Sequence, residues 1–265
     1  MRILFFGNNW VGWQVAKWLK EYGEEIVGVV IHPAGKRKFG DEIIESSNVS
    51  PEAVFDGSQL RQPETIEAVR ALQPEIGISV LFDYILNQEF LDLLPSGCLN
   101  LHPSFLPYNR GNYPNVWSII EGTPAGATLH YMDKGLDTGD IIAQREIEVE
   151  PVETGATLYR KLEQTSVALF QEAWPAARAG ALERRSQKDL QEGTYHRARD
   201  VEKIDEIKLD QTYVARDLLN VLRARTFPPY RGAYFVEQGR KVYLSLQLTY
   251  EDEWDAQQHE EREHD

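Results

Sequence analysis

The stretch MRILFFGNNWVGWQVAKWLKEYGEEIVGVVI, residues 1–31, indicates the class of fold. An apolar run at 3–6, followed by a Gly-Asn-Asn turn, predicts a buried strand. Residues 10–22 have the apolar spacing of a helix, which should end at Gly23, and 26–31 form the next apolar run. A strand, a helix and a second strand in this order predict parallel strands covered by helices.

The same alternation continues downstream. We expect helices at 65–72 and 88–94 and strands at 76–81, 97–102, 127–132 and 141–149. A long helix should follow at 155–174, where Pro175 should stop or kink it. The pattern predicts a Rossmann-like α/β fold, a mainly parallel sheet flanked by helices, with its ligand site beyond the carboxyl ends of the strands.

The last part of the chain differs in kind. From about residue 183 the sequence becomes irregular and charged, and then predicts a helix at 212–223 and a β-hairpin at 233–246 that turns at Gln238-Gly239. We therefore expect a main domain at 1–182, a smaller C-terminal region at 183–250, and an acidic, disordered tail at 251–265.

Composition excludes several classes of protein. The formal charge of the 265 residues is −14, and half of it lies in the last fifteen. The rest of the chain is also acidic, which argues against sequence-independent binding to nucleic-acid phosphates. No stretch approaches the roughly 20 apolar residues that a membrane span requires, and no signal-like cleavage site follows the start. Cys98 is the single cysteine, which rules out an internal disulfide and a cysteine-based metal cluster and favours a cytoplasmic location.

The glycines near the start do not form a nucleotide-binding motif. Gly7 and Gly12 are five residues apart, and neither the dinucleotide pattern nor the P-loop pattern is present. We interpret Gly7 as a turn glycine. A nicotinamide-dependent enzyme or a P-loop enzyme is therefore disfavoured.

Asn100 and His102 are the first candidates for chemistry. Two residues apart at the end of a strand, they share a face, and Pro103 ends the strand directly after them. An amide beside an imidazole can stabilise a developing oxyanion, although a capping Asn and a half-exposed His would give the same pattern. A carboxylate would orient the imidazole, and the spacing does not choose among Asp133, Asp137 and Asp140.

Three segments together resemble a known family. NLHPSFLP (100–107), RGNYP (110–114) with Trp117, and GLDTGDII (135–142) are similar to the formyltransferases that use 10-formyltetrahydrofolate. The resemblance covers roughly residues 1–180. It implies that Asn100, His102 as an imidazolium, and Asp137 are catalytic, that 1–182 is the catalytic domain, and that no metal is needed.

The resemblance also implies two ligand sites. The folate should lie against 79–86 and the 133–137 loop, with contacts from Phe82, Asp83, Tyr84, Leu86, Asp133 and Gly135. Read by periodicity alone, 79–86 is simply a buried strand that runs into a turn. The acceptor should contact Arg110, Tyr113 and Trp117, while a surface salt bridge is the alternative for Arg110.

Three branches of the family differ in their acceptor. Methionyl-tRNA formyltransferases carry a larger, basic C-terminal domain, and glycinamide ribonucleotide formyltransferases begin with a Gly-Ser-Asn that is absent here. The chain is most similar to the branch that formylates a nucleotide-linked amino deoxysugar, in the context of polysaccharide biosynthesis. The other readings are a methionyl-tRNA formyltransferase-like enzyme and a folate- or nucleotide-sugar-binding protein without turnover.

RARTFPPYRGAYF (223–235) mixes cations with aromatic rings, as a site for a diphosphate and a base would. Arg223, Arg225, Phe227, Tyr230 and Arg231 are the candidates, and a packed turn with solvated arginines is the alternative. The hairpin that follows resembles the part by which relatives form homodimers. His130 and His196 have no metal partner at a suitable spacing, so we interpret both as structural.

Overall fold

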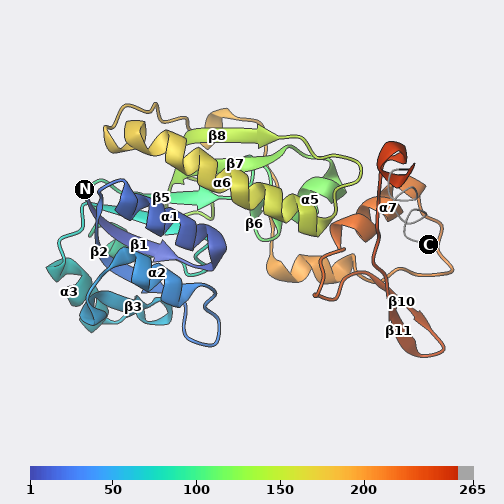
Figure 1. Ribbon diagram of the computed structural model, residues 1–265, viewed down its shortest axis with the longest axis horizontal. Coiled ribbons are helices and arrows are strands. Elements are labelled where there is room, and N and C mark those ends of the chain that lie inside the picture. The colour runs from blue at the N-terminus through green and yellow to red at the C-terminus, as the bar shows by residue number, and fades with distance from the viewer. Residues whose placement is uncertain (256–265) are drawn as a thin grey trace.

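The computed structural model describes residues 1–255. Its centre is a seven-stranded sheet with the strand order β3-β2-β1-β4-β5-β7-β8 (Figure 1). The strands are β1 (Arg2–Gly7), β2 (Glu25–Ile31), β3 (Val54–Asp56), β4 (Ile76–Val80), β5 (Cys98–His102), β7 (Ala125–Tyr131) and β8 (Ile141–Ile147). The first five are parallel, and β7 and β8 are antiparallel to their neighbours. The predicted fold, mainly parallel and Rossmann-like, is confirmed.

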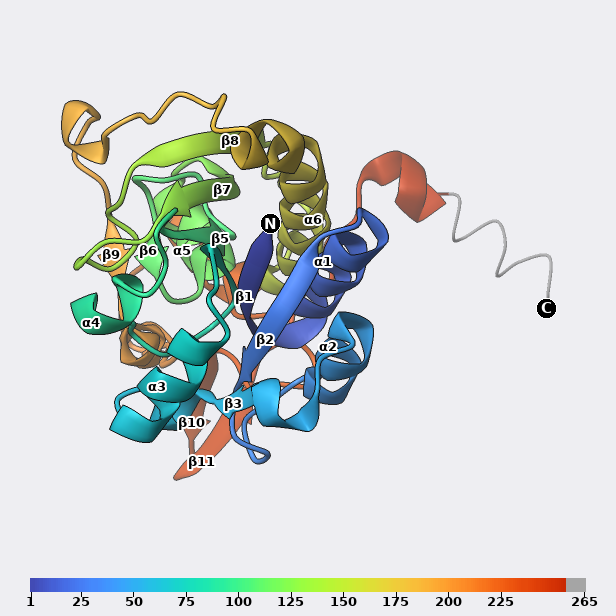
Figure 2. The same cartoon turned by 90° about the vertical axis from the view of Figure 1, so that its left-hand side faces the viewer.

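Helices cover both faces of the sheet (Figures 1 and 2). On one face, α1 (Asn9–Glu21), α2 (Gly40–Ser47) and α6 (Gly155–Arg178) enclose a core that includes Phe5, Leu99 and Trp174. On the other face, α3 (Pro63–Ala71) and α4 (Gln88–Leu91) enclose a smaller core around Phe6 and Phe90. The sheet is therefore buried between two helical layers, as parallel strands require.

Further elements extend this body. Helix α5 (Pro114–Glu121) packs beside α6 and α7 (Ala215–Ala224) in a third apolar cluster. Two-residue strands β6 (Arg110–Gly111) and β9 (Tyr195–His196) pair in parallel, which brings the chain after α6 back to the body. Short 3-10 helices occupy Pro51–Ala53, Gly57–Gln59, Gln187–Asp189 and Ala198–Lys203.

The hairpin lies at the end of the molecule away from the N-terminus (Figure 1). Strands β10 (Tyr234–Glu237) and β11 (Arg240–Tyr243) turn at Gln238 and Gly239, both with positive φ, which is the geometry of a two-residue hairpin turn. Residues 251–255 form one helical turn with exposed side chains. The rest of the predicted tail lies outside the described residues, so its disorder stays a prediction.

Some local predictions were wrong. The helix expected to end at Trp174 continues through Pro175 to Arg178, because a proline this near the end removes only one of the helix's last hydrogen bonds; a kink at Pro175 stays a prediction. The helix expected at 88–94 is a single turn that ends at Leu91. Helices α2 and α5 and strand β3 were not predicted. Within residues 1–255, no helix combines the length and the apolar character needed to cross a bilayer.

Candidate active site

Strand β5 presents Asn100 and His102 on the face of the sheet that α3 and α4 cover. Leu99 and Leu101 point into the core under α1 and α6, whereas Cys98 belongs to the opposite core, so every second residue of β5 faces α3 and α4. His102 is buried at the end of the strand, and its Nε2 lies 3.2 Å from the carbonyl oxygen of Asn109. The two side chains share a face, as predicted.

Asp137 reaches them from the loop between β7 and β8. Its backbone is left-handed, with a φ of 54°, and the Gly111 N–H donates to its Oδ2 at 2.9 Å. Its Oδ2 lies 3.8 Å from the Nε2 of His102, and its Oδ1 lies 3.4 Å from the Nδ2 of Asn100. The structure therefore brings the three predicted side chains together.

The two other aspartates of this loop face elsewhere. Asp133 accepts hydrogen bonds from the Gly135 N–H and the Thr138 hydroxyl, which fold the loop on itself. The Asp140 carbonyl accepts from the Tyr131 N–H and holds the base of the loop. Sequence spacing did not show which of the three aspartates lies beside His102. In the structure it is Asp137.

His130 also contacts this group, although sequence analysis gave it only a structural interpretation. It pairs with Asn100 across β5 and β7. The Nδ2 of Asn100 donates to its Nε2 at 3.2 Å, and the same Nε2 lies 3.6 Å from the Oδ1 of Asp137. The register between two antiparallel strands creates this contact, and the sequence carried no signal for it.

The hydrogen bonds fix the protons of both imidazoles. Because a carbonyl oxygen only accepts, His102 carries a proton on Nε2, toward Asn109, and His130 carries one on Nδ1, toward the Tyr131 carbonyl 2.8 Å away. The Nε2 of His130 is then free to accept from Asn100. This assignment also fixes the orientation of the Asn100 carboxamide, with its nitrogen toward His130 and Asp137.

Burial sets the charge state of the pair. It lowers the pKa of His102 below the ordinary value by more than the Asp137 carboxylate raises it. Burial alone would raise the pKa of Asp137, but the two histidines and the Gly111 N–H hold it well below its usual range. These directions favour an ionised Asp137 beside a neutral His102 at neutral pH, and the imidazolium that the resemblance implies stays a prediction.

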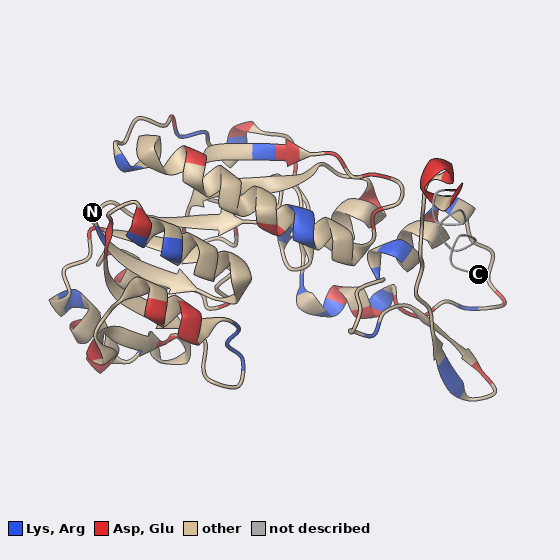
Figure 3. Cartoon of the chain, in the orientation of Figure 1, with Lys and Arg blue, Asp and Glu red and all other residues tan. Residues whose placement is uncertain are grey.

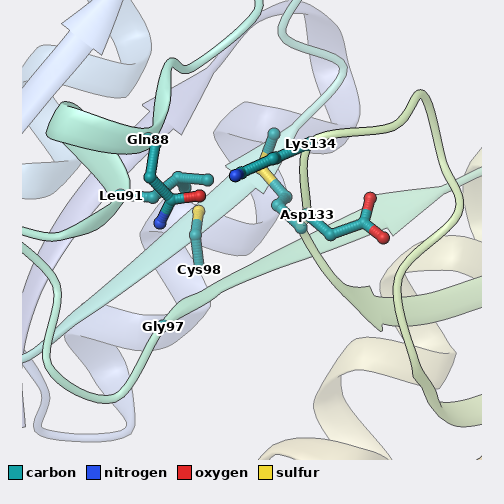
Figure 4. A pocket seen from close by; sticks show the side chains of 7 residues that line it. Gln88, Leu91, Gly97, Cys98, Asp133 and Lys134 are labelled. Atoms are coloured by element: carbon teal, nitrogen blue, oxygen red, sulfur yellow. The ribbon is translucent and has the colours of Figure 1, made fainter.

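A cavity of about 500 Å³ opens on the same face of β5, two residues before Asn100 (Figure 4). Apolar and polar side chains mix in its wall, and its lining residues are Gln88, Leu91, Gly97, Cys98, Met132, Asp133 and Lys134. Such a mixture suits a flat ligand with hydrogen-bonding edges.

Of the residues predicted to contact folate, only Asp133 lines this cavity. Phe82 and Tyr84 pack on each other and on His32, and Leu86 is buried in the core under α3 and α4. The Asp83 side chain is exposed, and Gly135 lies in the β7–β8 loop. The other lining residues escaped sequence analysis because they come from separate elements.

The acceptor candidates near α5 have different environments. Arg110 donates to the Oε1 of Gln187 through Nε at 3.2 Å and Nη2 at 2.8 Å. Trp117 is buried and stacks on His196, with 4.0 Å between ring centroids. Tyr113 is exposed at the start of α5.

The residues of 223–235 that were predicted to bind the diphosphate and the base do not gather around one site. Arg223 donates to the carbonyls of Glu150, Pro151 and Glu153, and Arg225 forms a bidentate pair with Asp205. Both guanidinium groups are thus occupied within the protein. The Phe227 ring lies between Tyr159 and Tyr230, and the exposed Tyr230 lies near the ammonium of Lys38. Arg231 is exposed and lies near the ring of Tyr243 in the hairpin.

Two parts of the chain match known families. Residues 1–174 match the family described as Formyl transferase, and residues 200–250 match the N-formyltransferase dimerization C-terminal domain. The chain belongs to the formyltransferase family. It is therefore an enzyme that transfers a formyl group, and the expectation of a binding protein without turnover is set aside.

Its relatives act on two kinds of acceptor. The chain is 33% identical, over 94% of its length and 79% of the relative, to the methionyl-tRNA formyltransferase of Bacillus subtilis. It is 38% identical, over 57% of its length and 64% of the relative, to the dTDP-4-amino-4,6-dideoxyglucose formyltransferase of Mycobacterium tuberculosis.

A solved relative carries ligands. The formyltransferase of Anoxybacillus kamchatkensis, in complex with UDP-4,6-dideoxy-4-formamido-L-AltNAc and tetrahydrofolate, is 31% identical with a TM-score of 0.55, over 77% of this chain and 89% of its own. These comparisons establish the reaction of the family and leave the acceptor to be proposed.

The C-terminal residues 200–250 carry little net charge. They contain eight Lys and Arg and seven Asp and Glu, which is nearly neutral. In Figure 3, acidic and basic residues are interspersed over the helices. Binding to tRNA draws its affinity from clustered cations, and residues 200–250 hold only one more cation than anions. Among residues 1–255, no three His, Cys, Asp or Glu side chains are grouped to hold a metal ion.

Proposed function

We propose that this formyltransferase moves the formyl group of 10-formyltetrahydrofolate to the amine of a nucleotide-linked amino deoxysugar. The convergence of Asn100, His102 and Asp137 beside the cavity on the same face of β5 carries the proposal. The enzyme acts as a homodimer in the cytoplasm, consistent with the dimerization-domain match and one buried free cysteine.

The folate donor supplies an activated formyl carbon, and we place its ring in the cavity. Leu91, Cys98 and Met132 offer apolar contact, while Gln88 and Asp133 offer hydrogen-bonding groups at the edge. Because Cys98 and Asn100 are two residues apart on one face of β5, about 7 Å separates the cavity wall from the reacting groups.

The three polar side chains divide the work. His102, neutral at rest with its proton on Nε2, accepts on Nδ1 the proton that the attacking amine loses, and the imidazolium so formed is stabilised by the Asp137 carboxylate, 3.8 Å from Nε2. Asn100 donates to the oxygen that gains negative charge. Its bond to Asp137, at 3.4 Å, is long and weak, so this N–H is oriented in advance and loses little when the oxyanion replaces the carboxylate as its acceptor. His102 then returns the proton to the departing folate nitrogen.

The acceptor lies on the other side of these groups. We assign Arg110 and Tyr113 to the sugar end and the rings of Phe227 and Tyr230, beside Lys38, to the nucleotide end. Trp117, Arg223 and Arg225 act in this proposal by shaping the walls, since each is packed against the protein. The chemistry of these groups does not select among dTDP, UDP and GDP.

The acceptor is tested directly. The protein is incubated with 10-formyltetrahydrofolate and a panel of dTDP-, UDP- and GDP-linked sugars with an amine at C3 or C4, and mass spectrometry detects the formamide. We expect one sugar to be formylated with a rate that changes little with salt. A Met-tRNA sample is assayed in parallel, because the similarity to the methionyl-tRNA formyltransferase of Bacillus subtilis supports tRNA as a second candidate acceptor. Formylation of the tRNA alone, steeply dependent on salt, would overturn the proposal.

A further inference from the structure

A segment between the two family matches runs along the active site. We call residues 185–196 the strap; they lie between residues 1–174 and 200–250, which match the two families. The backbone of Arg185 exchanges hydrogen bonds with Ile141 at 2.8 and 2.9 Å, and the Thr194 carbonyl accepts from the Arg110 N–H at 3.0 Å. The strap therefore pairs with the start of β8, directly after the Asp137 loop, at one end and with strand β6 at the other.

Gln187 is the strap residue that touches both sides. Its Nε2 donates to the carbonyl oxygens of Asp137 at 2.9 Å and Gly139 at 2.8 Å. Its Oε1 accepts both hydrogen bonds from Arg110. The side chain is 5% exposed, and its two N–H groups and two lone pairs are all used.

These bonds restrain Asp137 at two points. Its carboxylate is held by the N–H of Gly111, and its own carbonyl is held by Gln187, which also holds Arg110, the residue next to Gly111. The φ of Asp137 is positive, a conformation that non-glycine residues keep only when their surroundings impose it. The carboxamide of Gln187 supplies part of that constraint.

We propose that Gln187 is a positioning residue for formyl transfer, because its carboxamide locks the Asp137 loop to strand β6 and so aims the carboxylate at Asn100 and His102. The inference rests on the formyltransferase activity of the family and not on which amine is the acceptor. Gln187 itself does not touch the reacting groups.

Two substitutions distinguish the hydrogen bonds of Gln187 to the Asp137 loop from those to Arg110. Gln187→Met removes all four hydrogen bonds at similar volume. Gln187→Glu keeps an oxygen for Arg110 and even adds charge, but it places a second oxygen against the carbonyls of Asp137 and Gly139, which repel it. If Gln187 served only to orient Arg110, Gln187→Glu would be harmless.

The control is another glutamine with the same chemistry. Gln144 donates to the carbonyl of Leu106 at 2.7 Å and accepts from the Arg185 guanidinium of the strap, but its hydrogen bonds do not reach the Asp137 loop, so it controls for loss of another strap contact. Gln144→Met removes a comparable amide, so any general loss of stability appears in it too.

The test has two readouts. With whichever acceptor the panel identifies, kcat should fall by about 10- to 100-fold in both Gln187 variants, as expected for a displaced catalytic group, and stay within about threefold in Gln144→Met. In the ligand-free protein, NMR titration should show a lower pKa of His102 in both Gln187 variants than in the wild type, because the attraction of Asp137 is reduced.

The outcomes are separable. Full activity and an unchanged His102 titration in folded Gln187→Glu would overturn the positioning role. Loss of stability in Gln187→Met with wild-type kcat and titration would mark a merely structural residue. If no sugar is formylated but Met-tRNA is, the proposed acceptor fails while the NMR readout still tests Gln187. If Gln187→Met does not fold, Gln187→Glu decides.

Discussion

The amide of Asn100 is the donor most directly tied to the proposed chemistry. Its Nδ2 donates to His130 and weakly to Asp137, so the carboxamide is oriented before substrate arrives. An oxyanion donor held in advance costs no reorganisation during the reaction.

Asn100→Ala should therefore lower kcat by about 10²–10³ without unfolding the protein. Steady-state kinetics with 10-formyltetrahydrofolate measure it. Asn115→Ala is the control, since Asn115 is a buried asparagine whose amide donates to the Gly155 carbonyl and not to the catalytic group. Undiminished turnover in Asn100→Ala would refute the assigned role.

The charge state of His102 gives a second expectation. Burial lowers its pKa and the Asp137 carboxylate raises it. His102 should thus titrate below 6.5 in the free enzyme, and Asp137→Asn should move that titration lower still, because the raising influence is lost. NMR of the imidazole signals, assigned with His102→Gln, measures both. A rise of the His102 pKa in Asp137→Asn would contradict the assignment.

Among the elements, α6 is fixed at its C-terminal end by a buried carboxylate. Glu24, just before β2, is 3% exposed and accepts from the Nε1 of Trp174 at 3.0 Å and the Nε of Arg178 at 2.7 Å. These bonds join the last turns of α6, around and beyond Pro175, to the amino-terminal end of β2.

Glu24→Ala should cost about 1–3 kcal/mol of unfolding free energy, because it leaves the buried Trp174 N–H without an acceptor. Denaturant titration measures the change. Glu25→Ala is the control, since Glu25 forms an exposed pair with Arg2 and should cost under about 1 kcal/mol. Equal losses in the two variants would show that the buried contact contributes nothing special.

The register of β5 and β7 explains why His130 was missed. Periodicity predicted both strands, but the pairing of Asn100 with His130 depends on how two antiparallel strands align. In the same way, the short helices α2 and α5 follow turns with left-handed residues at Phe39 and Tyr113, which side-chain patterns did not reveal.

For the whole molecule, the expected homodimer involves the hairpin. Val242 is exposed on β11 opposite Phe235 of β10, at the end of the molecule remote from the sheet. Exposed apolar residues gathered on a projecting hairpin favour burial against a second copy.

Val242→Asp should weaken the dimer, because a charge replaces apolar surface at the interface. Sedimentation velocity measures the change, and Lys241→Ala on the same strand should leave the dimer intact. A wild-type protein that remains monomeric at micromolar concentrations would contradict the expected dimer.

The sequence by itself determined the layered α/β body, the hairpin with its turn, and the pairing of Asn100 with His102 on one strand, because these depend on local periodicity and turn chemistry. The tertiary structure alone decided that His130 and Gln187 join the group and that Arg223 and Arg225 are occupied internally. It also placed Asp137 beside His102, which the family resemblance had implied and the spacing had not. Those contacts link residues up to about seventy positions apart, and only the packing of separate elements brings such residues within hydrogen-bonding distance.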